Sequence, residues 1–119
     1  MPSGPPGRIT DAPLFVVPRM LDALRAAHAG PKLAGLPADA PGHARLTAEL
    51  DGLGRRLLDG VEAHPTRFWV MRQIRQSLEA VGDEDLRTRR CFCHELEHLL
   101  AILGTEDVDG LIAHYVTQP

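Results

Sequence analysis

Apolar residues recur at every third or fourth position through the middle of the chain, and this spacing constrains the fold more than any other feature. The clearest example runs through Leu46, Leu50, Leu53, Leu57 and Val61. An α-helix has about 3.6 residues per turn, so residues at this spacing lie on one face of a helix. No segment alternates apolar and polar residues as a half-buried strand does. The sequence therefore predicts amphipathic helices, each of which buries one face.

Residues that start or stop helices divide the chain further. Pro18 suits the first residue of a helix, Thr66 suits an N-cap, and Glu84 and Asp85 are expected in a first turn, where the helix dipole favours negative charge. Glycine and proline mark the ends of the segments. The predicted helices cover about residues 18–29, 46–64, 66–81, 83–104 and 107–116.

Composition supports an all-α fold. Leucine and alanine dominate the apolar residues, whereas Phe, Trp and Tyr make up only 4% of the chain, which favours helices over strands. A length of 119 residues suits one domain. We therefore predict a compact bundle of four to five helices over residues 9–119, preceded by a flexible Pro/Gly-rich segment at 1–8. Within residues 9–17 the chain is expected to be extended and to lay Leu14, Phe15 and Val17 onto the helices.

The charges are distributed unevenly along the chain. The net charge of −3 argues against a general nucleic-acid surface. From Cys91 onward there is no Lys or Arg, and the acidic residues there are Glu95, Glu97, Glu106, Asp107 and Asp109. A molecule polarised in this way can steer a basic partner to its acidic end. The alternative is a solvated acidic face without a partner.

The sequence gives no sign of export or of membrane insertion. Cys91 and Cys93 are two residues apart and point to different sides of a helix, so they are not expected to pair. No stretch matches the apolar region of a signal peptide or the roughly 20 apolar residues of a membrane span. We expect a cytoplasmic protein without a membrane contact.

One motif in the fourth predicted helix could carry chemistry. Residues His94-Glu95-Leu96-Glu97-His98 spell H-E-x-x-H, which resembles the motif of the zincin metalloproteases. The resemblance implies zinc bound by His94 and His98, with Glu95 activating a water molecule. Residues 104–109 are similar to the G-T-x-x-x-D pattern of the aspzincin subgroup, which implies Asp109 as a third ligand.

Helical geometry favours a different interpretation of the same motif. Phe92, Leu96, Leu99 and Leu103 share one face of the helix, so both histidines lie on the face that points away from the core. Glu97 also places a charge where zincins usually have an uncharged residue. We therefore predict exposed polar residues, with no catalytic set and no cofactor. A non-catalytic zinc site is a further alternative, in which at most two of Cys91, His94 and His98 share the ion.

Trp69, the single tryptophan, lies almost opposite the inward stripe of its helix. If it is exposed, it is a candidate anchor for a protein partner, because tryptophan is enriched among the residues that dominate binding energy. Alternatively, the extended segment around Leu14 and Phe15 covers it. The sequence leaves both interpretations open.

The chain from Arg67 through Cys91 to Leu111 resembles the C-terminal half of small, uncharacterised bacterial helical domains. That resemblance implies a helical fold and a bacterial setting. Together with the charges, it leads to a hypothesis of a protein-interaction module, such as an immunity or antitoxin protein that binds a basic toxin or effector. The expected contacts are Trp69, Glu97, Glu106, Asp107 and Asp109. The alternatives are the zinc-dependent metallohydrolase and a purely structural or oligomerisation domain, and the oligomeric state stays open.

Overall fold

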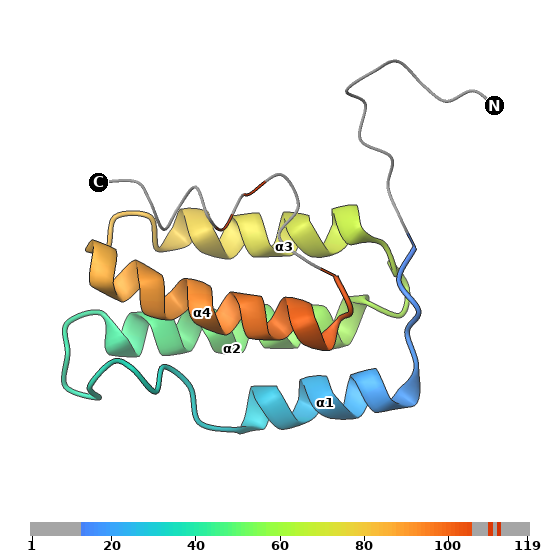
Figure 1. Cartoon of the computed structure of the whole chain (residues 1–119), viewed down its shortest axis with the longest axis horizontal. Helices are drawn as coiled ribbons and strands as arrows, with labels where there is room; N and C mark the ends of the chain where they lie inside the picture. Colours follow the sequence, from blue (N-terminus) through green and yellow to red (C-terminus); the bar gives the residue numbers. More distant parts are fainter. Residues whose placement is uncertain (1–12, 106–109, 111, 113–119) are drawn as a thin grey trace, which may run out of the picture.

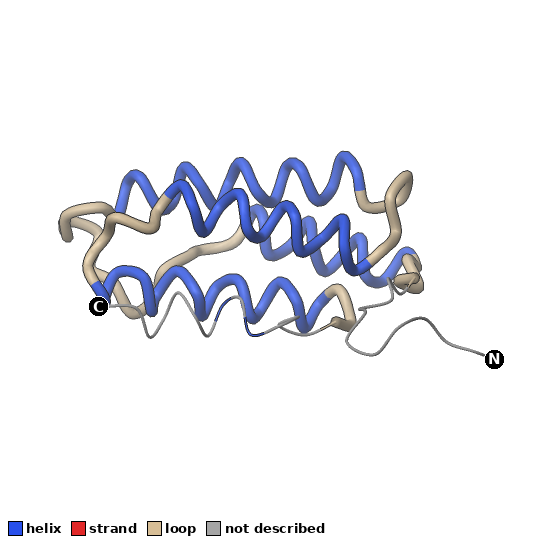
Figure 2. The backbone as a smooth tube through the Cα atoms, turned by 90° about the horizontal axis from the view of Figure 1, so that it is seen from above, coloured by secondary structure: helices blue, strands red, loops and turns tan. Residues whose placement is uncertain are grey.

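The computed structural model describes residues 13–105, Gly110 and Ile112, and this part of the chain contains four helices. They are α1 (Pro18–Ala29), α2 (His43–Gly60), α3 (Arg67–Ala80) and α4 (Leu86–Ile102). Consecutive helices run in opposite directions with their axes roughly aligned, as the two perpendicular views show (Figures 1 and 2). α1 packs against α2 and α4, and α2 also packs against α3. No strand is present within these described residues, so the predicted all-α class is confirmed.

The apolar stripes that the sequence predicts form the core. All five residues of the α2 stripe are buried, with exposed fractions between 0% and 3%. The stripe of α3 is buried as well, and it consists of Met71, Ile74, Leu78 and Val81. Burial of such side chains is the main force that holds helices together, at about 25 cal/mol per Å² of apolar surface. Helical periodicity therefore identifies the inward faces of α2 and α3 correctly.

Two of the expected helix starts are also confirmed. Pro18 occupies the first turn of α1, where its missing N–H costs nothing. Thr66 is the N-cap of α3, and its hydroxyl accepts a hydrogen bond from the backbone N–H of Trp69 at 3.2 Å.

The start of α4 differs from the prediction. The helix begins at Leu86 rather than near Asp83, and Asp85 is its N-cap, accepting a hydrogen bond from the Thr88 N–H at 2.8 Å. Asp83 and Glu84 instead lie in the preceding turn, where both carboxylates contact Arg45 of α2, at 2.9 and 2.7 Å. These ion pairs join residues far apart in sequence, so local pattern alone places the acidic residues in the wrong turn.

The cap at Asp85 makes stability depend on pH. Its hydrogen bonds from Thr88 hold the pKa of the Asp85 carboxyl below its ordinary value. A lowered pKa in the folded state stabilises the protein above the ordinary aspartate pKa of about 3.9, and that stabilisation is lost as the pH falls through the folded-state pKa. Asp85→Ala should therefore be destabilised relative to wild type at pH 7, with a difference that shrinks toward pH 3. Urea unfolding at several pH values measures this difference, and a constant difference would contradict the assignment.

Residues 13–17 form an N-terminal strap across the α2–α3 turn. Pro13 pairs with Thr66 in an isolated β-bridge, and the Leu14 N–H donates to the carbonyl of Pro65 at 2.7 Å. Leu14 is buried, but Phe15 is 83% and Val17 48% exposed, so the prediction that all three cover the helices is wrong for two of them. The physical reason is that successive side chains of an extended chain point to opposite sides. With Leu14 inward, Phe15 and Val17 face outward.

Some expectations fall on residues that the structure does not describe. The flexible segment at 1–8 lies outside the described residues, as does the predicted fifth helix apart from Gly110 and Ile112. Ile112 is buried, with its carbonyl oxygen 4.0 Å from the Cys93 Sγ. Among the described helices, none has the length and apolar character that crossing a membrane requires.

Candidate functional site

The rotation of α4 decides how the H-E-x-x-H motif is presented. Phe92, Leu96 and Leu99 are buried in the core, whereas His94, Glu97 and His98 are exposed. The predicted division of this helix into an apolar and a polar face is therefore confirmed. Both motif histidines therefore lie on the exposed face of α4, away from the core.

Glu95 lies between the histidines and holds a loop. Its Oε2 accepts a hydrogen bond from the backbone N–H of Leu33 at 3.3 Å, which ties α4 to the connection between α1 and α2. Leu33 has a φ of 59°, in the left-handed region that residues other than glycine rarely adopt. Its side chain is only 2% exposed, so burial and this hydrogen bond together hold the strained backbone in place. The sequence gives no local signal for this contact.

The two histidines border different hollows. His94 lies beside Cys91 and Arg90, opposite the loop at Leu33–Gly35, whereas His98 lies beside α1. Within the described residues, no three side chains of His, Cys, Asp or Glu gather closely enough to hold a metal ion. Asp109, the third ligand implied by the aspzincin resemblance, lies outside the described residues, as do Glu106 and Asp107. Cys91 and Cys93 do not form a disulfide with each other, as expected.

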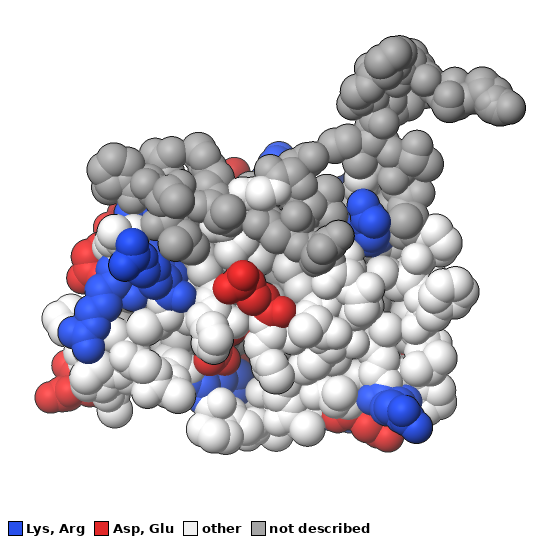
Figure 3. All heavy atoms as spheres, in the orientation of Figure 1, with Lys and Arg blue, Asp and Glu red and all other residues white. Residues whose placement is uncertain are grey.

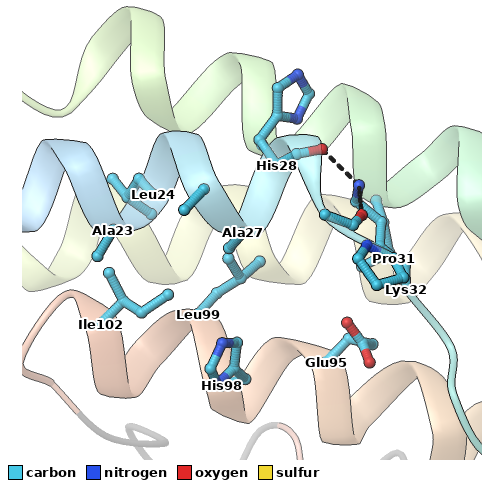
Figure 4. A pocket seen from close by; sticks show the side chains of 14 residues that line it. Ala23, Leu24, Ala27, His28, Pro31, Lys32, Glu95, His98, Leu99 and Ile102 are labelled. Carbon is cyan, nitrogen blue, oxygen red and sulfur yellow. Dashed lines mark hydrogen bonds between the residues drawn. The ribbon is translucent and has the colours of Figure 1, made fainter.

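A cavity of about 440 Å³ lies between α1, α2 and α4, and one end of it is next to the motif. Alanines of α1 leave the space open opposite the larger side chains of α4 (Figure 4). Its apolar wall consists of Ala23, Leu24, Ala26, Ala27, Leu50, Leu99 and Ile102. Its polar end carries Lys32, Glu95 and His98. A mostly apolar cavity with a few polar groups at one end is typical of small-molecule sites.

The charged groups at the polar end differ in how fully they are partnered. The Lys32 ammonium donates to the carbonyls of His28 and Gly30, at 2.5 and 3.1 Å, and lies 3.3 Å from an oxygen of Asp51. Lys32 therefore caps the C-terminal end of α1 and has its charge balanced by Asp51. The described contacts of Glu95 involve only one carboxylate oxygen, so the other remains able to accept a hydrogen bond.

His28 is among the residues that border the cavity, but its ring is directed toward α2 (Figure 4). The imidazole points from α1 toward α2 (Figure 4), where it lies against Gly54. A Cβ added at Gly54 would be 2.5 Å from the His28 Nδ1. The glycine thus permits the end of α1 to approach α2 closely, and the ring does not contribute to the polar end of the cavity.

Trp69 is half-buried and is not the freely exposed anchor that the sequence leaves open. Its ring stacks on His64, with centroids 5.6 Å apart, and lies directly over Gly60. His64 and Gly60 therefore both contact the tryptophan ring, whereas Phe15 points outward from the strap. Gly60 makes this contact possible because a Cβ there would be 2.4 Å from the ring.

The strongly exposed aromatic side chain is Phe15, which sequence reasoning places on the core. Together with Val17, Glu62 and Pro65 it borders a shallow hollow beside the α2–α3 turn. Phe68 at the start of α3 is a further exposed aromatic residue, at 38%. Alternation along the strap is the signal that could have identified Phe15 as outward-facing, once Leu14 is taken as inward.

Charges of both signs lie along α4, since the acidic Asp83, Glu84 and Asp85 directly precede its basic first turns. Basic side chains gather over its first turns (Figure 3), where Arg87 and Arg90 are exposed, and the acidic Glu95 and Glu97 follow further along the helix.

Comparison of the chain with known protein families, with curated proteins and with solved structures found no match.

Proposed function

We propose that this chain is a protein-interaction module that binds a basic partner. The observation that carries the proposal is the exposure of Phe15, at 83%, on a strap whose backbone is held by Pro65 and Thr66. An exposed aromatic ring on a fixed backbone loses little freedom on binding and buries a large apolar area. Glu62 beside it is exposed and supplies negative charge to the same hollow.

Charge supports a basic rather than an acidic partner. α4 ends at the same end of the molecule as the strap (Figure 1), and the acidic residues Glu106, Asp107 and Asp109 follow it in sequence. Glu97 is exposed on α4 itself. In the proposal these four carboxylates steer the partner, while Phe15 and the exposed part of Trp69 anchor it. A bacterial immunity or antitoxin protein that neutralises a basic toxin or effector fits this combination.

The finer form of the fold belongs to the same proposal. Burial of Ile112 against α4 supports a fifth helical element after Gly104, which would complete a bundle of five helices.

The proposal is tested by capture from a lysate of the native host. Phe15→Ala and the four reversals Glu97→Lys, Glu106→Lys, Asp107→Lys and Asp109→Lys should each weaken retention of the same basic protein. We expect about thirtyfold weaker binding for Phe15→Ala, the size of a typical anchor residue. Asp39→Lys is the matched control, because it reverses an exposed charge in the α1–α2 connection at the opposite end of the molecule (Figure 1). A captured set that is the same for all variants would overturn the proposal.

The zinc-dependent metallohydrolase is the alternative, with His94, His98 and Asp109 as ligands and Glu95 as the base. No third ligand joins the two histidines among the described residues, so the structure adds nothing in its favour. About one zinc ion per purified chain, lost on His98→Ala, would identify this alternative.

A further inference from the structure

We propose that the cavity between α1 and α4 binds a small organic cation with a compact apolar body, whose protonated amine bonds the carboxylate of Glu95. None of the described residues that line this cavity borders the hollow beside the strap. Its ligand is recognised by shape along the helices and by charge at one end.

The shape of the cavity favours a compact, apolar body. At about 440 Å³ it lies within the usual range of roughly 300–1,000 Å³ for small-molecule sites. Ala23 and Ala27 face Leu99 and Ile102 across it (Figure 4), so a rounded hydrocarbon would contact both helices. Burying such a body removes apolar surface from water on both the ligand and the protein.

The charges at the polar end favour a cation. The charge of Lys32 is balanced by Asp51, and its ammonium group donates hydrogen bonds to two carbonyl groups. The described contacts of Glu95, in contrast, include no cation. Lys32, Asp51 and Glu95 together therefore carry one net negative charge at this end. The second oxygen of Glu95 and the imidazole of His98 can accept hydrogen bonds from an ammonium group. A carboxylate ligand would face Glu95 without a free partner.

The site is also preformed. The hydrogen bond to the N–H of Leu33 fixes the Glu95 side chain, and the left-handed backbone at Leu33 places the loop against it. Lys32 anchors the adjacent end of α1. A ligand would therefore find the carboxylate in position and would lose little affinity to ordering the protein.

Three probes with one apolar body test the proposal: adamantanemethylamine, adamantanemethanol and adamantanecarboxylate. Binding to the full chain is followed by amide chemical shifts at pH 7, where the amine is protonated. We expect the amine to bind at least about tenfold more tightly than the other two, with shifts at Ala23, Ala27 and Leu99. Equal binding of the three probes, tightest binding of the carboxylate, or no shift at these residues would each overturn the proposal.

Three variants separate recognition of the amine from nonspecific binding. Glu95→Gln retains an oxygen for the Leu33 N–H but removes the charge, so the preference for the amine should fall by about tenfold. Glu79→Gln is the matched control, since it makes the same change at an exposed residue of α3 that does not line the cavity, and it should leave probe binding unchanged. Ala27→Leu fills the cavity and should abolish binding of all three probes. Unchanged binding in Glu95→Gln would also overturn the proposal, even if Ala27→Leu fails to fold.

Discussion

Phe92→Ala is expected to lower the free energy of unfolding by about 3–5 kcal/mol. Phe92 is the largest of the completely buried side chains, and it sits on the inward face of α4. Its removal loses the transfer free energy of the ring and leaves a cavity, which the surrounding leucines can fill only by moving. Urea denaturation followed by circular dichroism measures the change.

Phe15→Ala provides the control for this prediction, since the same chemical change is made at a ring that is 83% exposed. We expect its unfolding free energy to stay within about 0.5 kcal/mol of wild type, as for most surface substitutions. If the two variants lost similar stability, α4 would be rotated differently and the assignment of its inward face would be wrong. Phe15→Ala would in that case also be unsuitable for testing partner binding.

Gly60→Ala is expected to destabilise the protein by about 1–3 kcal/mol, although alanine favours helices more than glycine does. A Cβ at this position would be 2.4 and 2.8 Å from two carbon atoms of the Trp69 ring. The ring is stacked on His64, so it cannot move away from the added methyl group without disturbing that contact. The fluorescence of the single tryptophan should change together with the stability.

Gly52→Ala in the same helix is predicted to have the opposite effect. A Cβ there meets only the end of the Arg56 side chain, at 3.8 Å, which is ordinary contact. The substitution should therefore stabilise the protein by about 0.5–1 kcal/mol, the usual gain from replacing glycine inside a helix. Equal and stabilising effects at both glycines would show that Trp69 does not lie against Gly60.

Much of the fold could be predicted because each inward stripe depends on local geometry. The spacing of Leu46, Leu50 and Leu53 determines a shared helix face wherever that helix packs. The same reasoning placed the leucines of α4 inward and its histidines outward. For the candidate site it predicted which residues are exposed, but not what lies opposite them.

The errors occurred where a contact with a residue distant in sequence influences the local structure. Arg45 of α2 holds Asp83 and Glu84 in a turn, so α4 begins later than its acidic residues indicate. The hydrogen bond of Leu14 to Pro65 fixes which side of the strap faces the helices, and it thereby exposes Phe15. Neither partner is identifiable from the local pattern.

The sequence by itself determined that this protein is helical and which faces of α2, α3 and α4 are buried, because helical periodicity is a property of neighbouring residues. Only the tertiary structure decided that Glu95 holds Leu33, 62 residues away, and that small side chains of α1 leave a cavity beside it. It also decided that Gly60 makes room for Trp69. These features depend on how the helices approach one another, and that approach is fixed by the shapes of side chains from separate parts of the chain.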